Sequence, residues 1–130
     1  MTSITEQVHG RFKVFVGQPD SQGRIDDLAG KVTAWVVSAK VAPKSIGVEY
    51  LESTKNVVLT VGYRDDEPPY QIKLSLVPMG KIAKLDPGSI AQLEKAMGEA
   101  ASKIPNIICH ELYVTADHGF HMVFMSHLQK

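Results

Sequence analysis

Residues 107–128 carry the sequence IICHELYVTADHGFHMVFMSHL, which predicts a β-hairpin with strands at 107–115 and 119–128. Both strand segments are rich in β-branched and aromatic residues, and the polar segment 116–119 between them supplies the turn. Four of the five histidines in the chain lie in this hairpin, together with Cys109 and Glu111. Because these side chains can transfer protons or bind metals, the hairpin is the first candidate for a functional site.

The expected pairing of the hairpin brings histidines together. A two-residue turn at positions 117 and 118 places His110 opposite Met125, and it makes His110 and His127 diagonal neighbours on one face, which His121 shares. His110 and His127 are therefore candidates to bind one metal ion or to act as a proton-transfer pair. The alternative is that these histidines lie on a half-exposed strand face and have no chemical role.

Glu111 is a further catalytic candidate, as a ligand or base beside these histidines. In an alignment of the chain's two hairpins it matches Glu49. The two carboxylates are therefore expected either to meet as an acid–base pair, or each to lie at a sheet edge or pair with a nearby Lys or Arg. Cys109 and His110 are neighbours on a strand and therefore point to opposite faces. This spacing predicts a buried, unreactive thiol rather than a thiol–imidazole pair.

Upstream of the hairpin, hydrophobic periodicity predicts further strands and two helices. Alternating apolar residues indicate strands, and apolar residues at intervals of three and four indicate helices. Pro43 is expected to end the first helix, and Asp86 with Pro87 to begin the second. The expected strands are 11–17, 46–53, 57–64 and 70–77, and the expected helices are 25–41 and 86–103.

The resulting order, β-α-β-β-β-α-β-β, predicts a single α+β domain over residues 1–130. We expect two helices to pack on one side of a mostly antiparallel, curved sheet. The order also divides into two β-α-β-β halves, 12–64 and 71–127, which makes an internal duplication one interpretation. The other interpretation is that any two alternating hairpins align in this way.

The predicted strands carry more apolar surface than two helices cover. In the last hairpin Leu112 and Phe124 are apolar on one set of positions, and Tyr113 and Val123 are apolar on the other. A sheet with helices on one side only is expected to be polar on its open side. We therefore expect a second copy, a peptide or a small apolar ligand to cover the open face, a homodimer being the simplest solution. The alternative is a sheet that curls around a core of its own.

Candidate ligand-binding residues come from two parts of the chain. The strands contribute Tyr50, Glu49, Tyr113 and His121. The segment before the second helix contributes Lys81 and Lys84, which could hold an anion at the helix amino terminus. This segment lacks the glycine and Ser/Thr pattern of a phosphate-binding Walker motif, and a solvated loop is the alternative.

Composition and charge narrow the function classes. Lys plus Arg and Asp plus Glu both number 14, so the formal charge is zero, which argues against a nucleic-acid binder. One cysteine permits no internal disulfide, residues 1–11 lack the apolar core of a signal peptide, and no apolar run is long enough to cross a membrane. We therefore expect a cytoplasmic protein with no nucleic-acid partner, no membrane partner and no cofactor.

Two functions remain open from the sequence. The favoured hypothesis is a small, homodimeric binding or assembly module whose apolar sheet face holds a second copy, a peptide or a small ligand. The alternative is a small enzyme or metal-binding protein whose site is the histidine-rich hairpin.

Overall fold

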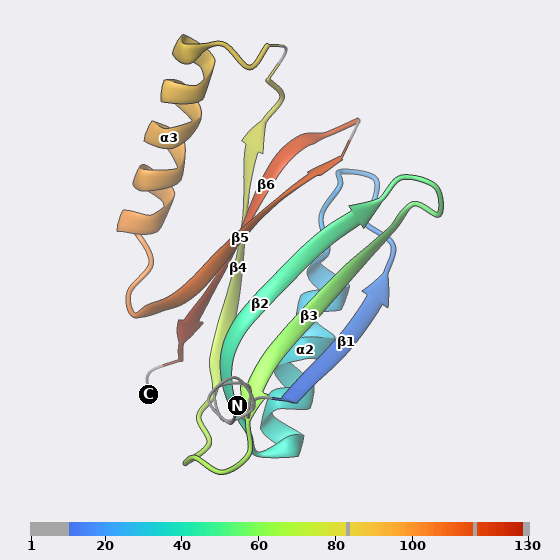
Figure 1. Ribbon diagram of the computed structural model, residues 1–130, viewed down its shortest axis with the longest axis vertical. Helices are drawn as coiled ribbons and strands as arrows, with labels where there is room; N and C mark the ends of the chain where they lie inside the picture. The colour runs from blue at the N-terminus through green and yellow to red at the C-terminus, as the bar shows by residue number, and fades with distance from the viewer. Residues whose placement is uncertain (1–10, 83, 116, 129–130) are drawn as a thin grey trace, which may run out of the picture.

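The computed structural model describes residues 11–82, 84–115 and 117–128 (Figure 1). Residues 1–10, 83, 116 and 129–130 lie outside the described residues. Sequence analysis placed residue 83 in the Lys81–Lys84 segment and residue 116 in the last turn. The elements in chain order are β1 (Arg11–Gly17), α2 (Asp26–Ala39), β2 (Ala42–Leu51), β3 (Asn56–Arg64), β4 (Ile72–Gly80), α3 (Pro87–Ser102), β5 (Ile107–Thr115) and β6 (Gly119–His127).

The α+β class and the predicted order of strands and helices are confirmed. The strands form two three-stranded antiparallel sheets, with the order β1-β3-β2 in sheet A and β4-β6-β5 in sheet B. Each β-α-β-β half therefore builds its own sheet, and in both sheets the last strand of the half lies in the centre.

Helix α2 is the centre of the hydrophobic core. Its first turn carries Asp26 and Asp27, which suit the positive end of the helix dipole, and its buried face carries Leu28, Val32 and Val36 at helical spacing. The same core cluster includes residues of both sheets. Helix α2 contacts β1 and β4, the outer strands of the two sheets, while β2 lies beside β5. The two sheets therefore curve together around α2.

Local signals set the helix ends, with small corrections to the prediction. Helix α2 ends at Ala39 because Lys40 adopts a left-handed conformation (φ 56°), and Pro43 lies inside β2 instead of ending the helix. Helix α3 begins as expected, since the Asp86 carboxylate accepts a hydrogen bond from the backbone N–H of Ser89 (2.8 Å). It flanks sheet B on the side away from sheet A (Figure 1). No helix among the described residues is long and apolar enough to cross a membrane.

The predicted register of the last hairpin is wrong by one residue. Tyr113, not Val114, lies opposite His121, and His110 lies opposite Phe124 instead of Met125. The physical reason is the length of the loop. Strand β5 ends at Thr115 and β6 begins at Gly119, so three residues connect them instead of the assumed two-residue turn. Because side chains alternate along a strand, the shift moves every residue of one strand to the other face.

The apolar faces are covered unequally. In β6 both sets of side chains are buried within the chain, Met122 and Phe124 on one face and Val123 and Met125 on the other. The apolar residues of sheet B are therefore covered within the chain, as in the curled sheet that sequence analysis gave as the alternative. On the outer face of sheet A, by contrast, Phe12, Val14 and Val16 of β1 are 68%, 55% and 55% exposed.

Candidate functional site

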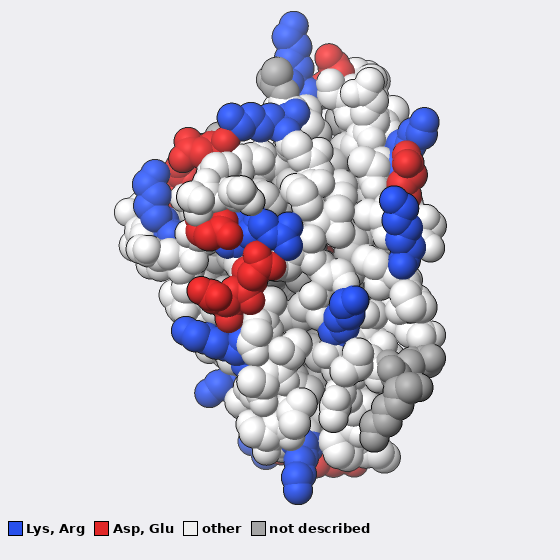
Figure 2. Space-filling model, turned by 180° about the vertical axis from the view of Figure 1, so that it is seen from behind, with Lys and Arg blue, Asp and Glu red and all other residues white. Residues whose placement is uncertain are grey.

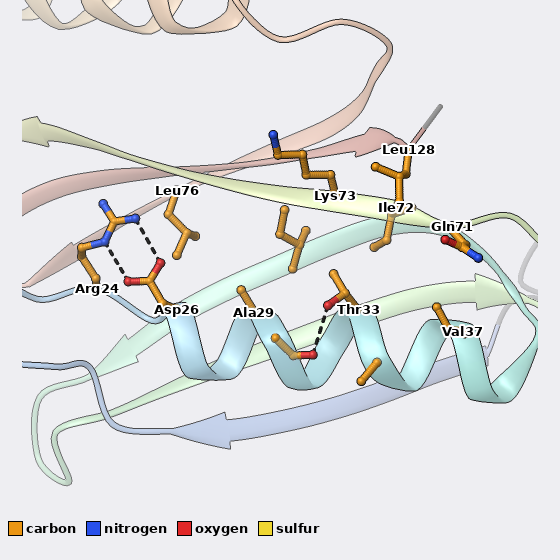
Figure 3. Close-up of a pocket in the computed structure, with 13 residues that line it drawn as sticks. Arg24, Asp26, Ala29, Thr33, Val37, Gln71, Ile72, Lys73, Leu76 and Leu128 are labelled. Carbon is orange, nitrogen blue, oxygen red and sulfur yellow. Dashed lines mark hydrogen bonds and ion pairs between the residues drawn. The ribbon is translucent and has the colours of Figure 1, made fainter. Parts of the chain in front are cut away.

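A groove lies between α2 and the outer strand β4 (Figure 3). Its volume is about 570 Å³, within the range of ~300–1,000 Å³ that is usual for ligand pockets. In Figure 3 Ile72 and Leu76 lie between the strand and the helix. The groove is lined by Arg24, Asp26, Ala29, Gly30, Thr33, Ala34, Val37, Gln71, Ile72, Lys73, Leu74, Leu76 and Leu128.

Small side chains on α2 make room for this groove. The helix presents Ala29, Gly30, Thr33 and Ala34 to it, and a Cβ added at Gly30 would meet no atom within 4 Å. The Thr33 hydroxyl donates to the backbone carbonyl of Gly30 (3.0 Å) and so leaves its methyl group for the groove. The helix wall is therefore low, while β4 supplies the apolar wall through Ile72, Leu74 and Leu76.

A second hollow of about 260 Å³ continues the groove beyond the carboxyl end of α2. The two hollows share Val37 and Gln71, and the second is completed by Val36, Lys40, Pro69 and Tyr70. Along β4 the groove extends from Gln71 to Leu76, about 17 Å at the ~3.3 Å rise of a strand. The arrangement is an elongated trough, not a compact cavity.

The charged groups lie at the ends and on the rim of the groove. At one end Arg24 donates two hydrogen bonds to the Asp26 carboxylate, 2.8 and 3.0 Å long, and these bonds lower the pKa of Asp26. Lys73 and Lys40 have no ion-pair partner among the described residues. Seen from behind, the molecule carries charges of both signs around an uncharged central stretch (Figure 2). The groove is thus apolar inside and basic at its rim.

The structure separates the two histidines that sequence analysis paired. His110 lies on the same face of sheet B as Phe124, and the centroids of their rings are 6.4 Å apart. The ring of His127 instead lies against that of Tyr70, with centroids 4.1 Å apart. The corrected register places them on opposite faces of sheet B. Among the described residues no three His, Cys, Asp or Glu side chains gather closely enough to hold a metal ion.

Tyr113 and His121 belong to the core instead of an open ligand site. Both are 3% exposed, and their rings stack with centroids 4.9 Å apart. The Tyr113 hydroxyl donates to the backbone carbonyl of Gly23 (2.9 Å), and burial raises the pKa of Tyr113 to about 12. Burial lowers the pKa of His121, whose Nε2 has no hydrogen-bond partner in the described part of the chain. His121 is therefore held in its neutral form.

Glu111 and Glu49 do not face each other. The Glu111 carboxylate accepts a hydrogen bond from the backbone N–H of Val48 (3.4 Å) and so links the neighbouring edges of the two sheets. Glu49 lies one residue further along β2, pairs with Val58 and is exposed on the outer face. Burial raises the pKa of Cys109, which disfavours the nucleophilic thiolate.

The remaining candidates lie in separate, smaller hollows. Tyr50 lines a polar hollow of about 170 Å³ between three loops, together with Lys55, Asp117 and His118. Lys81 lines another of about 170 Å³ beside α3. Lys84 is exposed, and the carboxylate of Asp86 already occupies the amino terminus of α3. Tyr50 therefore lies near the turn of the histidine-rich hairpin, but neither hollow includes His110 or His127.

Comparisons of the chain with protein-family models, with curated proteins and with solved structures find no match.

Sequence analysis did not identify the groove. It depends on the approach of α2 to β4, two elements separated by more than thirty residues. One local signal was present, because the side of α2 that lines the groove combines Gly30 with Ala29, Thr33 and Ala34. Small residues on a helix face permit another chain to approach closely.

Proposed function

We propose that this protein is a non-catalytic binding module whose groove between α2 and β4 holds a segment of another polypeptide. The observation that carries the proposal is the groove itself, an apolar trough about 17 Å long with a basic rim. A compact small molecule is usually enclosed on most of its surface, whereas this trough is open along its length. A linear chain is the occupant whose shape suits it.

The alternative function, an enzyme or metal site on the histidine-rich hairpin, has less support. His110 and His127 lie on opposite faces, Tyr113 and His121 are buried, and Glu111 is engaged with the backbone of β2. The single cysteine of the chain suits a reducing compartment, so we place the protein in the cytoplasm.

We further propose that the protein is a homodimer through the outer face of sheet A. Phe12, Val14 and Val16 lie in a row on β1 and are more than half exposed. Solvent-facing apolar rows of this kind favour burial against another surface. Because one copy presents the same row as another, a two-fold axis would bring the two rows together.

Replacing Gly30 by leucine is expected to lower the affinity of the groove for peptides at least about tenfold, or about 1.4 kcal/mol. The new side chain would project into the trough, since Gly30 lines it and the space beyond its Cα is open. Linear peptides would first be selected on the wild-type protein from a random displayed library. Their dissociation constants would then be measured by fluorescence polarisation.

The matched control for this variant is Gly98→Leu. Gly98 also lies within a helix, α3, where an added Cβ meets no atom within 4 Å. Both substitutions remove a glycine from a helix and are expected to stabilise that helix by roughly 0.5–1 kcal/mol. Only Gly30→Leu is expected to weaken binding. Failure to enrich any peptide, or equal binding by both variants, would contradict the proposed function.

Replacing Phe12 by glutamate is expected to convert the homodimer to a monomer, because it places a charge in the proposed apolar interface. Light scattering after size-exclusion chromatography at several concentrations would report the mass. Leu85→Glu is the control, since Leu85 is 73% exposed but lies outside sheet A. A wild-type protein that stays monomeric at every concentration would refute the dimer and leave the groove proposal standing.

A further inference from the structure

Strand β4 has one edge without a partner strand in the described sheets, and that edge borders the groove. β4 pairs only with β6 in the sheet order β4-β6-β5. The backbone N–H of Leu128 donates to the carbonyl of Gln71 (3.0 Å), and the register pairs Ile72 with His127. In an antiparallel ladder, residues alternate between bonding the partner strand and pointing away from it. The backbone groups of Ile72, Leu74 and Leu76 therefore point away from β6.

These residues also supply the apolar wall of the groove. Ile72, Leu74 and Leu76 line it with their side chains, and each offers one backbone N–H and one C=O on the open edge. An occupant that satisfies a row of alternating donors and acceptors at the spacing of a strand is itself an extended backbone. A helix satisfies its own backbone groups and could not do so.

The charged residues that line the groove indicate which charge the partner segment carries. Among the described residues, the two hollows are lined by three cations, Arg24, Lys40 and Lys73, and by one carboxylate, Asp26, which Arg24 already engages. In Figure 3 the ammonium group of Lys73 points away from α2, along the outside of β4. An occupant with carboxylates on its outer side would complement this rim.

We propose that the groove binds an acidic, extended segment of a partner protein, which adds to sheet B as a new strand beside β4. This inference rests on the proposed peptide-binding function and specifies its geometry. Alternate side chains of the bound segment face α2, where Ala29, Gly30 and Thr33 accept small or apolar groups. The intervening side chains lie beside Lys73 and Ser75, and there aspartate and glutamate are favoured.

The experiment is an N-methyl scan of a peptide selected on the wild-type protein, with binding measured after methylation of each backbone nitrogen in turn. Strand addition predicts losses of about tenfold or more at every second position and small changes between them, because only alternate N–H groups bond the edge. The phase of the alternation relative to an alanine scan reports whether the added strand is antiparallel or parallel to β4.

Charge reversal tests the acidic character separately. Lys73→Glu is expected to weaken an acidic peptide at least about fivefold, and a lysine-for-glutamate exchange in the peptide should restore binding. Lys95→Glu on α3, outside the groove, is the control and should leave affinity unchanged. In the N-methyl scan, affinity losses at every third or fourth position, or losses without periodicity, would overturn strand addition but leave peptide binding standing. Loss of peptide binding altogether would refute both, and peptide-independent dimerisation abolished by Gly30→Leu would identify a second copy as the occupant.

Discussion

Replacing Gly119 by alanine is expected to destabilise the domain by more than about 4 kcal/mol, which is exceptional for the addition of one methyl group. Gly119 opens β6 with a φ of 81°, a conformation that costs other residues about 1–2 kcal/mol. The added Cβ would also overlap the carbonyl of Gly80, 2.7 Å from its carbon, and would lie 2.8 Å from the Cα of Lys81. Backbone atoms would have to move to accommodate it.

Gly80 separates these two contributions. It has a similar φ of 88°, but a Cβ there would meet no atom within 4 Å. Gly80→Ala is therefore expected to cost only the conformational penalty of about 1–2 kcal/mol. Urea unfolding of both variants, followed by circular dichroism, gives the comparison. Equal destabilisation would show that β6 can move away from Gly80, contrary to the tight approach of the two strands.

The length of the loop before Gly119 explains where sequence-based prediction of the hairpin failed. The strand limits 107–115 were predicted correctly, because alternation and turn residues are local properties. The register depends on whether the loop holds two or three residues, which the sequence 116–119 leaves open. An error of one residue was enough to pair His110 with His127 on one face, although the structure separates them.

The limits of other elements were predicted correctly from local sequence signals. Strand β1 has the predicted limits, and α3 begins at Pro87 after the Asp86 cap. A sheet that curls around its own core was foreseen only as an alternative, and its division into two sheets around α2 was not foreseen, since the burial of a strand face depends on long-range packing. For the same reason the sequence directed attention to titratable residues on the hairpin, whereas the groove is made of small and apolar residues contributed by two distant elements.

Replacing Val32 by aspartate is expected to unfold the whole domain, with a loss of at least about 4 kcal/mol from burying an unpaired carboxylate. Val32 is 0% exposed and lies on α2 in the core cluster that joins both sheets. Fluorescence of Trp35, the only tryptophan, reports α2 and sheet A, where its ring contacts Phe15 and Tyr63. Hydrogen exchange of β4 and β6 amides reports sheet B.

Val37→Asp is the matched control, because it makes the same change on the same helix at a residue that is 52% exposed. It carries the same helix-propensity cost without burial, so a loss within about 1 kcal/mol is expected. If α2 holds both sheets in one cooperative unit, Val32→Asp must remove protection from sheet A and sheet B equally. Retained protection in β4 and β6 would mean that sheet B folds without α2. The groove would then be a contact between separable parts instead of a fixed feature of one domain.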